Sequence, residues 1–234
     1  MGNQYIDKTV GILGGMGPEA TIDLMQRIIR LTPAKDDIDH IRCLVDNNPK
    51  IPSRIKALID GDGEDPGPYL VKMAVGLQQS GADFLAIACN TAHYYYEEVS
   101  KAVKIPIIHI VDAVLALIQL NYPDCKKIGI LASPALQITK LYEQKFSQAG
   151  ITIVYPNAED QALLFKVIKA VKAGDLGDES QQCYTRICDN FAAQAIPLAI
   201  IACTELSVLK HCSSLQTVDA ADILAKQIIQ LAKC

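Results

Sequence analysis

Two cysteine motifs, far apart in the sequence, each follow a short apolar run, and this pairing constrains the fold more than any other feature. Phe84 to Ile87 precede the first motif, Ala88 to His93 (ACNTAH). Ala199 to Ile201 precede the second, Ala202 to Glu205 (ACTE). Such runs are typical of buried strands in a parallel sheet. We therefore expect each thiol at the carboxyl end of a strand and near a helix N-terminus, where open α/β sheets place their sites and where the pKa of a thiol is lowered.

The two halves of the chain resemble each other in three places and in the same order, which indicates an internal duplication. Besides the cysteine motifs, Lys8 to Gly15 is echoed by Lys126 to Ser133. The pair Asp112-Ala113, which follows a valine, is echoed by Asp219-Ala220. Between the strands, apolar spacing predicts helices at 18–31, 55–59, 69–80, 92–103, 113–120, 135–149, 160–173, 179–194 and 221–232.

Strands that alternate with helices predict an α/β fold with parallel sheets. With the duplication, they predict two pseudo-symmetric lobes, each a parallel sheet flanked by helices, with the active site in the cleft between them. We expect lobe A to comprise residues 1–111, with the C-terminal helix 219–234 packed back on it, and lobe B to comprise residues 112–218. Each lobe would bring one cysteine to the cleft.

Composition and charge narrow the range of partners. The net charge is −4 and no basic block is present, which argues against a nucleic-acid partner. No apolar run reaches the roughly 18 residues that span a membrane, and the first residues lack the apolar core of a signal peptide. We expect a cytoplasmic protein without a membrane partner. The six cysteines outside the two motifs show no CxxC or Cys/His metal spacing, and no metal site is predicted.

Two facing thiols suit one kind of chemistry in particular, the inversion of a carbon that carries a hydrogen next to a carboxylate. One group removes the proton from one face, and a second group returns a proton to the other face. A general acid or base works best with a pKa near the working pH, and a free thiol starts at about 8.5. A thiolate and a thiol on opposite faces can do this work without a cofactor.

Four motifs resemble those of the aspartate/glutamate racemase family. They are GGMGPEAT (Gly14 to Thr21), DNNPKIPSR (Asp46 to Arg54), ACNTAH and ACTE, and the match covers nearly the whole chain. The resemblance implies a cofactor-independent amino-acid racemase, commonly a homodimer, with Cys89 and Cys203 as general acid and base. Some family members replace one cysteine by threonine, whereas this chain keeps both.

The resemblance also implies how an amino-acid substrate with an acidic side chain is held. Arg54 would grip the side-chain carboxylate, which arginine binds bidentately. Lys172 matches a lysine that some members use for the same carboxylate. Glu205 could accept a hydrogen bond from the substrate ammonium, or could instead complement the dipole of a helix. His93, four residues after Cys89, could tune that thiol or could only pack in the helix.

Further residues of the motifs are expected around the substrate. Asn90, Thr91 and Thr204 would donate hydrogen bonds to the substrate carboxylate at helix N-termini, a role that is compatible with helix capping. Met16 and Gly17 would form the floor of the cleft, with the glycine allowing a close backbone approach.

Several other functions remain open at this stage. Gly15, Gly17 and Ala20 fit a G-x-G-x-x-G/A dinucleotide fingerprint, with Asp46 in the place of a ribose-binding acid. That interpretation leaves both cysteine motifs unexplained. A non-catalytic carboxylate-binding protein, and a decarboxylase or cis–trans isomerase of diacids, are further alternatives. The sequence does not separate aspartate from glutamate, and a broader range of amino acids also stays open.

Overall fold

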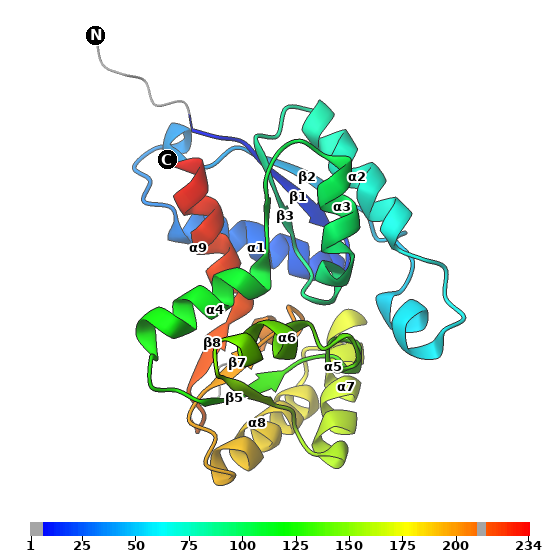
Figure 1. Ribbon diagram of the computed structural model, residues 1–234, viewed down its shortest axis with the longest axis vertical. Coiled ribbons are helices and arrows are strands. Elements are labelled where there is room, and N and C mark those ends of the chain that lie inside the picture. Colours follow the sequence, from blue (N-terminus) through cyan, green and yellow to red (C-terminus); the bar gives the residue numbers. More distant parts are fainter. Residues whose placement is uncertain (1–6, 210–213) are drawn as a thin grey trace.

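Two parallel sheets with the same strand order form the framework of the computed structural model, which describes residues 7–209 and 214–234 (Figure 1). The first sheet has the order β2-β1-β3-β4 and the second the order β6-β5-β7-β8. The strands of the first sheet are β1 (Val10–Gly14), β2 (Cys43–Asn47), β3 (Phe84–Ile87) and β4 (Ile107–Ile108). Those of the second are β5 (Lys127–Leu131), β6 (Thr152–Val154), β7 (Ala199–Ile201) and β8 (Thr217–Asp219). The predicted two-lobed α/β fold is confirmed.

The thiol-bearing strands are central in their sheets. β3 pairs with β1 in a register that sets Ile87 beside Leu13, and β7 pairs with β5 with Ile201 beside Leu131. Every residue of β1, β3 and β7 is buried. This explains their continuous apolar runs, because a parallel strand is covered by helices on both faces.

The hydrophobic interior consists of one central core and two outer cores, which helices cover. The helices are α1 (Pro18–Leu31), α2 (Gly67–Gln79), α3 (Tyr96–Ala102), α4 (Ile110–Asn121), α5 (Pro134–Thr139), α6 (Leu141–Gln148), α7 (Ala158–Lys172), α8 (Asp178–Ala193) and α9 (Ala220–Ala232). The central core joins the sheets, with Ile12 and Ala86 from the first and Ile130 and Ile200 from the second. Helices α2 and α3 cover the outer face of the first sheet, and α7 and α8 that of the second.

The C-terminal helix α9 packs against α1 and α4 (Figure 1). Near the ends of the described chain, the Lys8 N–H donates a hydrogen bond to the Ala232 carbonyl (2.9 Å). Helix α4 includes both Val111 and Asp112, so the predicted boundary between the lobes falls inside this helix. Among the described residues, no helix is both long and apolar enough to cross a membrane.

Two predicted helices differ from the structure. The prediction of one helix at 135–149 is wrong, because Lys140 has a φ of 51° and separates α5 from α6. A residue in the left-handed region cannot continue a right-handed helix. The predicted helix at 92–103 is α-helical only from Tyr96, and the turn before it is a 3-10 helix, η3 (Thr91–Tyr95).

Candidate active site

A cavity of about 400 Å³ opens where the carboxyl ends of both sheets meet. Side chains from the loops after β1, β3, β5 and β7 line it, together with the loop after β2 and the end of α7. The lining residues are Met16, Ser53, Arg54, Ile55, Cys89, Asn90, Thr91, Ser133, Lys172, Ala202, Cys203, Thr204 and Glu205. The structure therefore brings together every residue predicted for the site except Gly17, which lines an adjoining cavity.

Cys89 follows β3 directly, and its side chain is almost fully enclosed, with 8% of the residue exposed. The Ala88 N–H donates to the Leu13 carbonyl (3.0 Å), which continues the sheet hydrogen bonding up to the cysteine. The central position of the strand thus fixes the place of this thiol.

His93 holds the backbone at Cys89 and Ile110 through its ring nitrogens. The His93 Nε2 accepts a hydrogen bond from the Ile110 N–H (3.2 Å), and Nδ1 lies 2.9 Å from the Cys89 carbonyl oxygen. A ring that accepts at Nε2 is neutral and carries its proton on Nδ1, which donates to that carbonyl. Burial lowers the pKa of His93 to about 4, with a further contribution from His109. The alternative that His93 packs in the helix therefore describes it better than direct tuning of the thiol.

Cys203 follows β7 in the same way, is also 8% exposed, and has a carboxylate as its partner. The Cys203 thiol donates to Oε2 of Glu205 across 3.0 Å. Burial raises the pKa of Cys203 well above its ordinary value, the charge of Glu205 raises it further, and Lys172 offsets part of this rise. Cys89 also raises this pKa, so the two thiols lie near enough to interact electrostatically.

The predicted lowering of the thiol pKa is wrong for Cys203. The helix that follows it is only one 3-10 turn, η4 (Leu206–Val208), so no α-helix N-terminus stabilises the thiolate. The buried carboxylate of Glu205 disfavours a second negative charge beside it. Cys203 is therefore held as a thiol.

Glu205 joins Cys203 to Lys172. Its residue is 7% exposed, and its Oε1 lies 3.4 Å from the Lys172 Nζ. This is an ion-pair contact without hydrogen-bond geometry, so Oε1 has no hydrogen-bond partner among the described residues. The Glu205 carboxylate, which was expected to bind a substrate ammonium, thus neutralises Lys172 and accepts a hydrogen bond from the Cys203 thiol. Its Oε1 can still accept a hydrogen bond from a substrate.

Arg54 bridges two loops at the cavity wall. Its Nη2 donates to the Met16 carbonyl (3.1 Å) after β1, and its Nη1 donates to the Pro52 carbonyl (3.2 Å). Its Nε is buried and makes no hydrogen bond within the described part of the chain. Because a guanidinium carries five N–H donors, Arg54 is held in place and still has donors to offer.

The glycine loop after β1 fits closely against the loop after β2. Gly15 has a φ of 89°, and a Cβ on it would lie 2.2 Å from the backbone of Asn48, so only glycine fits there. A Cβ on Gly17 would meet only Oε1 of Glu205, at an ordinary 3.6 Å. Gly15 thus packs loop against loop, whereas Gly17 faces the adjoining cavity, and a close approach of substrate to Gly17 stays a prediction.

Two residues that support the site were not singled out from the sequence. The Tyr142 hydroxyl, fully buried in α6, donates to Oδ1 of Asn90 (2.7 Å). The Ser133 Oγ lies 3.3 Å from the Thr91 Oγ1, across the two lobes. The repeat offered a signal for Ser133, which stands in the second half where Gly15 stands in the first. No pattern in the sequence marked Tyr142.

A second cavity of about 840 Å³ adjoins the first. Both are lined by Ser53, Arg54, Lys172, Thr204 and Glu205. The rest of its lining comes from the start of α1 and from apolar side chains: Gly15, Gly17, Pro18, Glu19, Ala20, Pro49, Ile51, Val171 and Val208. In the described part of the chain, no group of three or more His, Cys, Asp or Glu is placed to hold a metal ion.

Known proteins with related sequences and folds are racemases. The chain is 29% identical over 226 residues to the broad specificity amino-acid racemase RacX of Bacillus subtilis, which covers 94% of this chain and 96% of that protein. Its fold matches the Picrophilus torridus aspartate racemase with a TM-score of 0.87 and 27% identity, over 96% of this chain and 94% of that one.

The fold also matches glutamate racemase from Francisella tularensis, solved in complex with D-glutamate, with a TM-score of 0.70 and 17% identity, over 97% of this chain and 81% of that one. At that identity the match concerns the fold alone. The sequence model of the Asp/Glu/hydantoin racemases matches residues 13–228, nearly the whole chain. The chain therefore belongs to the Asp/Glu/hydantoin racemase family and is an isomerase.

Proposed function

We propose that the enzyme interconverts the enantiomers of an acidic amino acid, aspartate or glutamate, by two-base proton transfer between Cys89 and Cys203. One observation carries this proposal. The two thiols line one cavity, and each comes from the carboxyl end of a central strand in one of two lobes with the same strand order. Such a pair can address opposite faces of a substrate carbon held between the lobes.

The proton transfers balance without a further reactant. A thiolate on one side takes the α-proton and becomes a thiol, and the electron pair of the broken C–H bond stays on the α-carbon next to the carboxylate. The thiol on the other side donates its proton to the opposite face of that carbon and becomes a thiolate. The configuration is inverted, the two thiols have exchanged protonation states, and no redox step has occurred.

Glu205 makes the two thiols unequal in the resting enzyme. The high pKa of Cys203, which is due to burial and then to Glu205, keeps this residue protonated as the acid. Cys89 then acts as the base in the direction that begins from this state. The other direction starts from the exchanged state, in which Cys203 is the thiolate that takes the α-proton and Cys89 is the thiol that donates a proton to the opposite face. Oε2 of Glu205, 3.0 Å from the sulfur, then accepts a hydrogen bond from the Cys203 thiol that this transfer forms. Lys172 pairs with the same carboxylate and offsets part of its effect on the pKa of Cys203.

Cationic and polar groups around the thiols favour a substrate with two carboxylates. Arg54 and Lys172 both line the cavity, and while Lys172 is paired with Glu205, Arg54 has no ion pair among the described residues and offers its charge to a side-chain carboxylate. Asn90, Thr91 and Thr204 line the space around the thiols and offer donors for the α-carboxylate. An aspartate racemase is among the proteins that share this fold at 27% identity.

Proton NMR of L-aspartate and L-glutamate in heavy water, with the purified enzyme, a reducing agent and no cofactor, tests the proposal. We expect the α-proton signal to disappear while the D-enantiomer accumulates on a chiral column. No loss of the α-proton from either substrate would refute racemisation of acidic amino acids. The same assay ranks the two substrates.

A broader substrate range is a second candidate, which the adjoining cavity favours. Ile51, Val171 and Val208 give this cavity apolar walls, and its opening is lined by the same Arg54 and Lys172. Side chains longer than that of aspartate could extend into it. RacX, at 29% identity, is described as a broad specificity racemase. The discriminating test is a panel of amino acids with wild type and Val208→Phe, because the larger ring should slow only the long substrates. Equal rates for long substrates in both proteins would contradict this use of the cavity.

A further inference from the structure

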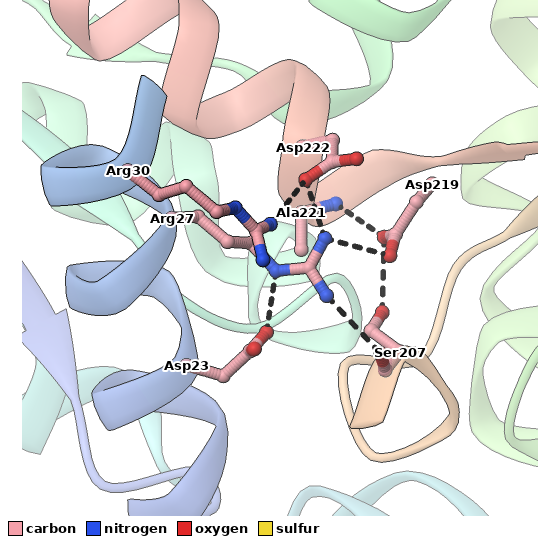
Figure 2. A network of polar contacts seen from close by, with 7 residues as sticks. All are labelled: Asp23, Arg27, Arg30, Ser207, Asp219, Ala221 and Asp222. Atoms are coloured by element: carbon pink, nitrogen blue, oxygen red, sulfur yellow. Dashed lines mark hydrogen bonds and ion pairs between the residues drawn. The ribbon is translucent and has the colours of Figure 1, made fainter. Parts of the chain in front are cut away.

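Arg27 is a buried arginine outside both cavities that ties three parts of the chain together (Figure 2). Its side chain is only 7% exposed. Within α1, its Nε donates to Asp23 (2.6 Å). At the start of α9, its Nη1 donates to Asp219 (2.9 Å) and Asp222 (2.5 Å). Its Nη2 donates to the backbone carbonyl of Ser207 (3.1 Å).

Ser207 is held at both of its polar groups. Its carbonyl accepts from Arg27, and its hydroxyl donates to Oδ1 of Asp219 (2.9 Å). Asp219 in turn accepts from Arg27, so the three residues form a closed ring of hydrogen bonds, drawn in Figure 2. Burial raises the pKa of Asp219, and the positive charge of Arg27 opposes this rise. Arg27 thus favours the ionised acceptor that the ring requires.

The ring lies next to the reacting end of the second lobe. Ser207 belongs to η4, and the first hydrogen bond of this turn runs from the Leu206 N–H to the Cys203 carbonyl (2.9 Å). On the upstream side, the Ala202 N–H donates to the Leu131 carbonyl (2.9 Å) and so continues the sheet. The segment with Cys203 and Glu205 is therefore fastened to the sheet at one end and to Ser207 at the other.

The arrangement needs an arginine in particular. Arg27 reaches two carboxylates of α9 and one backbone carbonyl at once, through both ends of its planar fork. A lysine in its place would keep the charge but would act as a single point without this geometry. Because α1 begins beside the glycine loop of the first lobe, the fork links the framework of the Cys89 lobe to the Cys203 segment.

We propose that Arg27 is a positioning residue for racemisation: by holding Ser207 it sets the place of the Cys203–Glu205 pair relative to Cys89. This inference rests on the proposed function, since it assigns Arg27 to the spacing of the two thiols. Displacements of about 1 Å in reacting groups can cost about 100-fold in rate. A loosened Cys203 segment should therefore lower turnover while leaving substrate binding by Arg54 unaffected.

The test compares Arg27→Lys with Arg30→Lys. Arg30 lies one turn further along α1, its side chain is 69% exposed, and its one ion-pair partner among the described residues is Asp222, at 3.9 Å. For Arg27→Lys we expect kcat to fall about tenfold with KM within about twofold, the pattern for an interaction that matters only in the transition state. We also expect alkylation of Cys203 by iodoacetamide, relative to Cys89 in the same molecules, to rise about threefold. Arg30→Lys should change neither the kinetic constants nor the alkylation ratio.

An unchanged kcat and an unchanged alkylation ratio in Arg27→Lys, even with a lower melting temperature, would reduce Arg27 to a structural ion pair and overturn the proposal. Should Arg27→Lys fail to fold, Asp219→Asn decides in the same way, since it replaces the oxygen that accepts from Arg27 by a donor, and so breaks the ring, while asparagine still caps α9; no change in either readout would overturn the proposal. Alkylation does not depend on racemisation. An inactive wild type would refute the proposed function, while the alkylation ratio would still decide whether Arg27 positions Cys203.

Discussion

At the scale of single residues, the two thiols at the centre of the site have different surroundings. Cys203 donates to Glu205 through its thiol, whereas Cys89 is held through its backbone carbonyl by His93. A sequence shows two cysteines in matching contexts, but it does not show which side chains from other elements meet them. Glu205 was therefore expected on the substrate, and the structure places it on the sulfur of Cys203 and beside Lys172.

Glu205→Gln should lower the pKa of Cys203, because the carboxylate is one of the charges that raise it. In a Cys89→Ser background, we expect the pH at which Cys203 alkylation is half-maximal to move to lower pH. In an otherwise wild-type chain, the loss of the carboxylate that holds the Cys203 proton in place should slow racemisation by about 100-fold. Glu159→Gln, which alters an exposed carboxylate paired with Arg186 away from the site, is the control. An alkylation profile identical to that of the Cys89→Ser parent would contradict the assignment of Glu205.

His93 should make the stability of the fold depend on pH. Its pKa falls from 6.5 to about 4 on burial, so the unfolded chain binds more protons than the folded one between these values. The free energy of unfolding therefore rises with pH across this window. The contribution of His93, about 3 kcal/mol, is fully present above pH 6.5 and is lost as the pH falls to 4. Urea unfolding at pH 4.5 and 7.5 measures this loss, which should be smaller in His93→Gln. An equal loss of unfolding free energy in wild type and in His93→Gln would contradict the assignment of this pH dependence to His93.

At the scale of elements, the strands that carry the site were predictable because burial on both faces leaves continuous apolar runs. Helix α1 was also predicted with its observed bounds, since Pro18 marks its first position. The break at Lys140 was not, because apolar spacing continues through it and only the backbone conformation of one exposed lysine changes. Tyr142 lies in the first turn of α6, just after that break, and its bond to Asn90 of the other lobe left no signal in the sequence.

Lys140→Gly should stabilise the protein by about 1 kcal/mol, because a non-glycine residue in the left-handed region carries a cost of this order. The side chain of Lys140 is exposed, so little packing is lost. Thermal or urea unfolding measures the gain. Lys140→Ala is the matched variant, since it removes the same side chain but keeps the Cβ; an equal gain in both variants would show that the backbone is not the cause.

At the scale of the whole molecule, two lobes with the same strand order meet at the carboxyl ends of their sheets and share a central core. The repeat in the sequence predicted this arrangement. The meeting of the two lobes places all the predicted site residues except Gly17 around one cavity. The details that the repeat could not supply are those in which the lobes differ. The Arg27 ring and the Glu205–Lys172 pair both contact the segment around Cys203, and both depend on residues from several elements.

The central claim is that each lobe supplies one of two bases acting on opposite faces of the same carbon. Cys89→Ser and Cys203→Ser, each given the L- and the D-enantiomer separately in heavy water, test it most directly. We predict that neither variant racemises, and that each exchanges the α-proton of only one enantiomer, the opposite one in the two variants. Racemisation at the wild-type rate by either variant, or exchange of the same enantiomer by both, would contradict the two-base account.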